Sequence, residues 1–199
     1  MINFNDIHLL LASQSPRRRA LLKELGFPVQ IVKAPDIEEV FPHHLKGGEI
    51  PIYLSRLKSE SYADTLDEHS ILVTADTIVW LDEEVIGKPE GRKEAIVMLK
   101  KLSGRKHVVY TGVCLKYRGE VHLFCDETSV YFKKLSEQEI MFYVDRCKPY
   151  DKAGAYGVQE WIGFVGVERM EGSYFNVMGL PTHRLYAEIC NLVERNCEG

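Results

Sequence analysis

The chain has 199 residues and a formal net charge of −4 at pH 7, with 45% hydrophobic and 27% charged residues. This composition is typical of a globular protein with a sizeable core and excludes a largely disordered chain. The acidic balance argues against a general nucleic-acid binder, because such proteins usually meet phosphate backbones with a basic surface.

Cysteine usage and the first residues indicate where the protein works. The five cysteines are odd in number and show no C-x-x-C spacing, which favours neither a disulfide framework nor a zinc site. Near the start, Asp6 stands where a signal peptide would be basic, and the apolar run is far shorter than the roughly 20 residues that span a bilayer. We therefore expect a soluble protein that stays in a reducing cytoplasm and has no membrane partner.

The first half of the chain predicts strands alternating with helices. Ser15 followed by Pro16 is typical of a helix start, and that helix is expected to stop at Gly26. The other elements expected here are strands at 9–12, 29–34 and 71–81, a helix at 51–66, and a turn at 82–83 that leads into a hairpin partner at 84–89.

The second half predicts a longer antiparallel pair and further helices. Ser136 and Glu139 form a capping box that starts a helix. The expected elements are a helix at 92–104, two strands within 106–135 that turn at 118–119, a helix at 137–147, a strand at 161–170, a loop at 171–181 and a helix at 182–195. This order predicts one α/β domain over 1–199, with a mixed, partly antiparallel, elongated sheet in two lobes around a cleft.

Asp76 is the sharpest candidate for chemistry. It interrupts an apolar, β-rich segment, and a buried carboxylate is costly unless it is paired, hydrogen-bonded or bound to a cation. Asp76 is therefore either a structural residue that caps a loop or part of a site. Lys88, at the far end of the expected hairpin, is near Asp76 if the two strands pair, but a lysine beside a turn proline is also an ordinary surface residue.

Three other polar positions have the same two interpretations. Glu38 and Glu39 follow the second strand in a turn, where carboxylates are commonplace, and Lys58 lies on the next helix. Together with Asp76, the glutamates would make a hard-oxygen site suited to Mg²⁺ or Mn²⁺, which prefer one or two carboxylates plus substrate phosphates.

The glycine-rich segment 152–159 matches neither a Walker loop nor a dinucleotide-binding motif. Its glycines allow a tight bend, or they let the backbone of Gly154 and Gly157 approach a ligand while Gln159 presents an amide to a base edge. The segment 172–181 has the same two interpretations. No H-E-x-x-H or G-x-S-x-G motif is present, so zinc and serine-triad catalysis have no support.

Seven segments together resemble the Maf family of nucleoside triphosphate pyrophosphatases in order and spacing. They are "LASQSPRRRALLKELG", "IEE", "LSRLKSE", "TADTIVWLDEEVIGKP", "LSGRKHVVYTGVCL", "YDKAGAYGVQ" and "GSYFNVMGLP". The resemblance implies a fold related to that of inosine triphosphatase, with a cleft between lobes. It also implies hydrolysis of a nucleoside triphosphate to the monophosphate and pyrophosphate with a divalent metal.

The resemblance also implies roles for single residues. The family positions that track substrate preference are Arg17, Thr77 and Gln159 here, a set that resembles the dTTP/UTP branch rather than the branch acting on 7-methyl-GTP. The implied metal ligands are Glu39 and Asp76. Asp76 is also implied as a catalytic residue, together with Lys58 and Lys88. Two small departures from the family pattern are Thr74 for glycine and Ser59 for alanine.

The arginines at the first helix gain an explanation from this resemblance. A helix N-terminus already carries partial positive charge, so exposed cations in its first turn cost roughly 0.3–1 kcal/mol each. The turn from Ser13 to Arg18 supplies backbone N–H groups and guanidinium groups that suit a phosphate or a base carbonyl. The charge of such a ligand would offset the local cost.

Two other function classes stay open at this point. One is a non-catalytic, nucleotide-binding regulator of septum formation, and the other is a nucleic-acid binder that uses Tyr156 and Tyr174, which the acidic net charge disfavours. The physiological role is either nucleotide-pool housekeeping or division arrest. A homodimer is one option for the oligomeric state, which the sequence leaves open together with the preferred metal.

Overall fold

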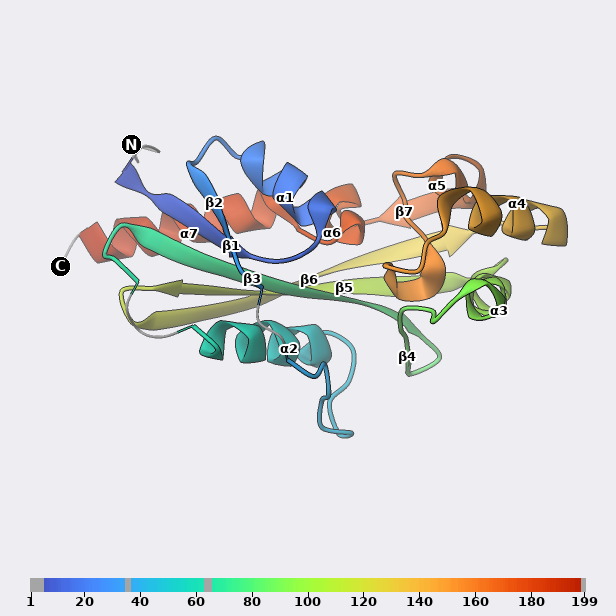
Figure 1. Ribbon diagram of the computed structural model, residues 1–199, viewed down its shortest axis with the longest axis horizontal. Helices are drawn as coiled ribbons and strands as arrows, with labels where there is room; N and C mark the ends of the chain where they lie inside the picture. The colour runs from blue at the N-terminus through green and yellow to red at the C-terminus, as the bar shows by residue number, and fades with distance from the viewer. Residues whose placement is uncertain (1–5, 35–36, 63–65, 198–199) are drawn as a thin grey trace. The chain divides into compact units, whose positions relative to one another are not determined.

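The computed structural model describes residues 6–34, 37–62 and 66–197, and in these ranges seven strands form one mixed sheet (Figure 1). Its strand order is β2-β1-β3-β5-β6-β7, and β4 pairs with β3. The strands are β1 (His8–Ala12), β2 (Val29–Val32), β3 (Ser70–Leu81), β4 (Glu84–Ile86), β5 (Lys106–Tyr117), β6 (Glu120–Phe132) and β7 (Val167–Glu171). Strand β1 pairs in parallel with β2 and β3, whereas β4 and β7 pair antiparallel with β3 and β6. The predicted mixed, partly antiparallel α/β fold is confirmed.

The chain divides into two compact units. The first contains the residues up to Asp76, the segment 111–126 and the residues from Gly179 onward, and the second contains 77–110 and 127–178. The long strands β3, β5 and β6 each contribute one part to either unit. A single domain over 1–199 and a cleft between lobes stay predictions.

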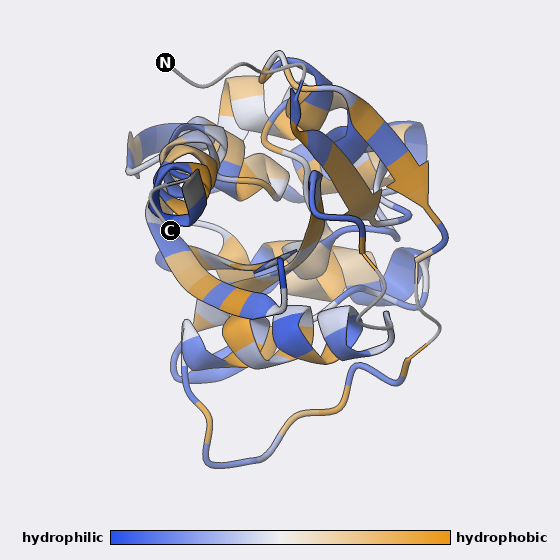
Figure 2. Ribbon diagram, turned by 90° about the vertical axis from the view of Figure 1, so that its left-hand side faces the viewer, coloured by the Kyte–Doolittle hydropathy of each residue, from blue (hydrophilic) through white to orange (hydrophobic). Residues whose placement is uncertain are grey.

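In the first unit, helices cover both faces of the sheet. Helix α2 (Glu49–Glu60) lies on one face, while α1 (Pro16–Lys23) and α7 (Thr182–Cys197) lie on the other (Figures 1 and 2). Hydrophobic and hydrophilic residues alternate along these helices, as expected of helices with one buried side (Figure 2). Among the described residues, no helix is long and apolar enough to cross a membrane.

Helix α2 lies unusually close to β5. A Cβ atom on Gly112 of β5 would stand 2.2 Å from the carbonyl carbon of Pro51, in the first turn of α2. Glycine is therefore needed at this position for the close approach of two backbones. The predicted helix at 51–66 begins two residues earlier than expected and ends at Glu60, and residues 63–65 of that prediction lie outside the described residues.

Two helix starts follow the local rules read from the sequence. The Ser15 hydroxyl accepts a hydrogen bond from the Arg18 N–H at 3.4 Å and caps α1, which ends at Lys23, three residues before the predicted stop at Gly26. In the second unit, Ser136 and Glu139 form both halves of the predicted capping box at the start of α4 (Glu137–Cys147). These contacts need only neighbouring residues, which is why the sequence alone predicts them.

The other helices of the second unit pack around a separate core. They are α3 (Arg92–Leu102), the short 3₁₀ turn η2 (Ala153–Ala155), α5 (Trp161–Gly166) and α6 (Tyr174–Met178). Helix α3 contacts α4 and η2, and the apolar side chains between them, such as Leu99 and Ile140, are almost fully buried. Burial of this kind stabilises the unit by about 25 cal/mol for each Å² of apolar surface removed from water.

Two sequence predictions in this unit are wrong. Residues 161–166, predicted as part of a strand, form α5, and the strand β7 begins only at Val167. The segment predicted as a loop at 171–181 contains the short helix α6, whose Asn176 N–H donates to the Ser173 hydroxyl at 3.3 Å. Asn176 is fully buried and its Nδ2 donates to the Val109 carbonyl at 3.1 Å. Such distant contacts override local preference.

Candidate active site

In the first unit, an ion-pair cluster surrounds Asp76 on β3. Asp76 is 7% exposed within a strand whose other residues are nearly all buried. Lys58, in the last turn of α2, donates from Nζ to Asp76 Oδ1 at 2.5 Å and to Glu39 Oε1 at 2.8 Å. Its ammonium group therefore joins the two carboxylates that were predicted as metal ligands.

Arg18 adds a second positive charge near these carboxylates. Burial lowers the pKa of the Arg18 guanidinium, and the negative charges of Asp76 and Glu39 act against that change. Arg18 Nε also donates to the Gly179 carbonyl at 2.7 Å. Helix α1 is thus tied to the segment that leads into α7, and the guanidinium is held where it interacts with both carboxylates.

Ser13 and Arg17 belong to the same turn. Ser13 is 5% exposed, and its hydroxyl accepts from the Ser15 N–H at 3.2 Å. The Ser13 carbonyl accepts from Arg19, whose Nε lies 3.2 Å away. Arg19, the third arginine in the sequence of α1, therefore has a structural partner just after β1. Arg17, on the same helix, is half-buried. In the parallel pairing of β1 with β3, Leu11 lies opposite Val73, so the turn after β1 lies beside the part of β3 that contains Asp76.

Lys88, Thr77 and Gln159 lie in the second unit. Lys88 is exposed and stands two residues beyond β4, while Thr77 follows Asp76 on β3. The glycine-rich segment is joined to the residue before Lys88, because the Gly154 N–H donates to the Gly87 carbonyl at 2.9 Å. Lys88 and the segment that carries Gln159 are therefore held together.

The conformation of this glycine-rich segment depends on Gly154. Its φ of +68° is in the left-handed region, and a Cβ atom there would stand 3.0 Å from Cγ2 of Val79. At the end of the segment, Gln159 Oε1 is buried and has no hydrogen-bond partner among the described residues. A buried acceptor without a partner costs about 1–3 kcal/mol, so a ligand that brings a donor to it is favoured.

Sequence reasoning missed a hydrogen-bonded network next to Gln159. The Tyr143 hydroxyl on α4 accepts from the Gly157 N–H at 3.0 Å and donates to Glu160 Oε2. Lys152 Nζ lies 3.0 Å from Glu160 Oε1. Glu160 directly follows the glycine-rich segment and Lys152 begins it, but nothing local in the sequence marks Tyr143 as their partner.

The donor set around Asp76 fits a divalent cation that is shared with a ligand. Over the described ranges, no group of three or more histidine, cysteine, aspartate or glutamate side chains is placed to hold a metal ion. Asp76 and Glu39 are two carboxylates that share one cationic partner, Lys58. Two carboxylates supplemented by substrate phosphate oxygens and water are the ligands that Mg²⁺ commonly uses.

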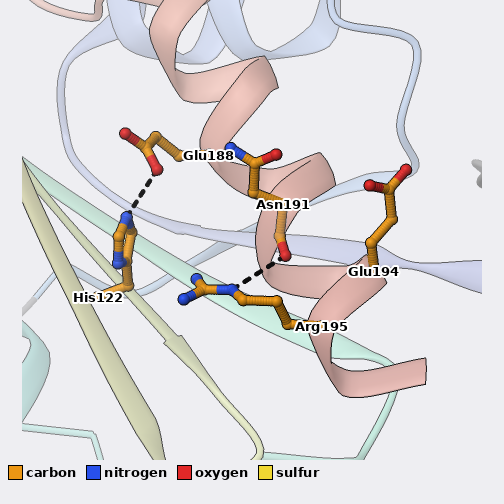
Figure 3. Close-up of a pocket in the computed structure, with 5 residues that line it drawn as sticks. All are labelled: His122, Glu188, Asn191, Glu194 and Arg195. Atoms are coloured by element: carbon orange, nitrogen blue, oxygen red, sulfur yellow. Dashed lines mark hydrogen bonds and ion pairs between the residues drawn. The ribbon is translucent and has the colours of Figure 1, made fainter. Parts of the chain in front are cut away.

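A hollow of about 420 Å³ elsewhere in the first unit holds none of the predicted site residues (Figure 3). His122 of β6 faces α7 across it, with Nε2 2.8 Å from Glu188 Oε2. Its other lining residues, all on α7, are Asn191, Glu194 and Arg195. The Arg195 Nε donates to the Asn191 carbonyl of the same helix at 3.2 Å.

Solved structures of similar fold identify the fold class of this chain. The Staphylococcus aureus Ham1 protein matches with a TM-score of 0.51 at 17% identity, and the match covers 91% of this chain and 99% of that one. A HAM1 protein from Coxiella burnetii matches with a TM-score of 0.50 at 15% identity, covering 93% and 99%. The chain therefore has a Ham1-like α/β fold.

The family follows from sequence similarity. The family model described as Maf-like protein matches residues 8–192. Proteins named dTTP/UTP pyrophosphatase from Bacteroides thetaiotaomicron and Phocaeicola vulgatus are 49% and 50% identical to this chain, and each match covers 96% of this chain and 98% of the relative. One of the same name from Porphyromonas gingivalis is 45% identical over 98% of both chains. The chain belongs to the Maf-like family.

Proposed function

We propose that this Maf-like protein hydrolyses dTTP and UTP to the nucleoside monophosphate and pyrophosphate, with a divalent metal ion. The observation that carries the proposal is the buried Asp76, which Lys58 joins to Glu39 through contacts of 2.5 and 2.8 Å. The names of the relatives at 45–50% identity support the choice of dTTP and UTP as substrates. The family match over 8–192 supports one functional domain.

In this proposal Glu39 and Asp76 would hold Mg²⁺ or Mn²⁺. The ion would supply positive charge to phosphate oxygens at the reacting centre. Lys58 contacts both carboxylates, and Arg18 interacts with both of them. The two cations therefore offset the negative charge of Glu39 and Asp76. A triphosphate brings negative charge into this cluster, so the existing cations favour its binding.

The chain's own residues then divide the chemical work. Asp76 orients a water molecule toward the α-phosphorus and accepts its proton as the water oxygen bonds to that phosphorus. The P–O bond to pyrophosphate breaks, and pyrophosphate leaves with the bonding electron pair. Lys58 and Lys88 neutralise charge on the leaving group. Because phosphoryl transfer requires little covalent work from the protein, positioning and charge supply most of the acceleration.

The remaining predicted residues bind the rest of the nucleotide. Arg17 and Arg18 contact phosphate or a base carbonyl through their guanidinium groups, and Ser13 belongs to the turn that supplies backbone N–H donors to the same ligand. Thr77 and Gln159 read the base edge through hydroxyl and amide groups. The buried Gln159 Oε1 without a partner supports this assignment, because a base N–H would satisfy it.

The test is a panel of nucleotides assayed for pyrophosphate release with Mg²⁺ or Mn²⁺. We expect dTTP and UTP to be preferred over ATP, GTP and 7-methyl-GTP. Reaction of UTP in ¹⁸O-labelled water should place the label in UMP. Label found only in the phosphate or diphosphate product would exclude attack at the α-phosphorus, and equal turnover of all five nucleotides would remove the proposed base selection.

A further inference from the structure

The Gln159 amide can meet a base edge in two ways. Its carbonyl end accepts a hydrogen bond and its NH₂ end donates, so exchanging the two ends changes what it recognises. Uracil and thymine present a ring N–H between two carbonyls, whereas cytosine presents a ring acceptor beside an amino group. An amide that turns freely therefore accepts both kinds of pyrimidine, and selection requires that it be held one way.

The Glu160 carboxylate and the NH₂ end of the Gln159 amide both lie close to Gly157. A Cβ atom on Gly157 would stand 2.9 Å from Gln159 Nε2 and 3.0 Å from Glu160 Oε2, so both groups border the same space over Gly157. A negative carboxylate attracts the positive NH₂ end of the amide and repels its carbonyl end. The carbonyl end, Oε1, is the atom that is buried without a partner among the described residues.

Glu160 is itself fixed from two sides. The Tyr143 hydroxyl donates to Oε2, and Lys152 Nζ lies 3.0 Å from Oε1. Tyr143 is fully buried, and burial together with the neighbouring Glu160 raises the pKa of its hydroxyl, which therefore stays a donor. The same hydroxyl accepts from the Gly157 N–H at 3.0 Å, so carboxylate and turn are positioned together.

We propose that Glu160 is a specificity-determining positioning residue that holds the Gln159 amide with its NH₂ end over Gly157, which leaves Oε1 to accept from the ring N–H of uracil or thymine. The inference rests on the proposed function. Cytosine brings an acceptor to this position and leaves Oε1 without a partner. The chain should therefore select dTTP and UTP against CTP as well as against purine nucleotides.

The first test compares kcat/KM for UTP and CTP in the wild type and in Glu160→Gln. This variant keeps the shape of the side chain but removes the charge that orients Gln159. We expect the UTP-to-CTP ratio to fall about threefold to tenfold, the range that one hydrogen bond carries. The change should come from KM, with kcat for UTP within a factor of two of the wild type.

Glu171→Gln is the matched control. Glu171 also accepts from a tyrosine hydroxyl, that of Tyr131 at 2.7 Å, and pairs with Arg169 in the same unit, but it lies on β7 outside the glycine-rich segment. We expect it to leave the ratio unchanged. Should Glu160→Gln fail to fold, Tyr143→Phe removes the donor to the carboxylate while keeping the buried ring, and the same fall is expected.

A double variant asks whether Glu160 acts through Gln159. In a Gln159→Leu background, Glu160→Gln should not change the UTP-to-CTP ratio further. An unchanged ratio in a folded Glu160→Gln variant would overturn the proposal. An equal fall with and without Gln159 would do the same, because the effect would then not pass through the amide.

The proposed function can fail separately. If the wild type releases no pyrophosphate from UTP, the proposed function is wrong. The role of Glu160 is then tested by measuring the binding of α,β-imido-UTP and α,β-imido-CTP by calorimetry. Tighter binding of the uridine analogue that is lost in Glu160→Gln would support the role of Glu160. Equal affinities in the wild type, or no binding of either analogue, would overturn it.

Discussion

Replacing Gly112 by alanine should separate α2 from β5. The new Cβ would stand 2.2 Å from the Pro51 carbonyl carbon and 2.3 Å from the Ile52 nitrogen. Because packed carbon atoms lie about 3.5–4.0 Å apart, one backbone has to move by about 1 Å or more. The obstacle is main chain and not the end of a flexible side chain, so no rotamer change relieves it.

The expected cost is at the upper end for overpacked cores, about 3 kcal/mol. In a chain of this size, 1 kcal/mol lowers the melting temperature by about 2–4 °C, which gives a fall of about 6–12 °C. Helix α2 also carries Lys58, and displacing a positioned group by 1 Å costs on the order of 100-fold in rate. Activity should therefore fall together with stability.

Urea denaturation and pyrophosphate release from UTP measure the two effects. Gly87→Ala is the control for stability, since a Cβ there meets nothing within 4 Å and its φ is not left-handed, so its free energy of unfolding should stay within about 0.5 kcal/mol of the wild type. A Gly112→Ala protein with a melting temperature within 2 °C of the wild type would refute the close approach of α2 to β5.

Three further predictions concern charge. Asp76→Asn should lower turnover by about 10²–10⁴ while the protein stays folded by circular dichroism, and retention of more than a tenth of the activity would make Asp76 structural. Glu139→Gln should lower the free energy of unfolding at pH 7 by about 0.5 kcal/mol. The hydrogen bond from Lys133 lowers the pKa of Glu139 to about 2, so this difference should fade in urea titrations as the pH falls from 4.5 toward 2, and a difference that persisted at pH 2 would argue against it. Burial lowers the pKa of His107 to about 4, so the unfolded chain takes up a proton between pH 6.5 and 4 that the folded protein does not. Wild-type stability should fall with pH in that window more steeply than that of His107→Phe, and parallel pH curves would show that His107 is not buried in its neutral form.

The elements that the sequence predicted correctly are those with local causes. The turn at Arg118 and Gly119 has both residues at positive φ, as does the turn at Asp82 and Glu83, and both join strands at the predicted places. The apolar period of 92–102 likewise identifies α3 without knowledge of its partners. In each case the signal lies within a few residues of the element that it predicts.

The segments that were predicted wrongly depend on distant or backbone contacts. Residues 161–166 are rich in apolar and aromatic side chains, which favours a strand. A Cβ on Gly163 would stand 1.7 Å from the Val158 carbonyl oxygen, so the helix is possible only because glycine lets the backbone of the preceding turn lie against it. Helix α6 has a local start signal at Ser173, and its buried Asn176 is held by the distant Val109 carbonyl.

The site was predictable to a similar extent. A carboxylate inside an apolar strand pointed to Asp76 on physical grounds, and family resemblance supported Glu39 and Lys58. In the structure Lys58 contacts both Asp76 and Glu39. Their roles in catalysis remain predictions. Tyr143 lies 17 residues from Glu160 along the chain, so no spacing rule could have joined them before the helix and the turn were placed.

Lys58 supplies positive charge to both Glu39 and Asp76. When a chelating buffer removes any metal ion during purification, this charge still offsets the repulsion between the two carboxylates. Protein prepared in this way should keep its fold and its melting temperature. Such a preparation is a practical starting material, because each candidate metal can then be titrated into one well-defined, folded state.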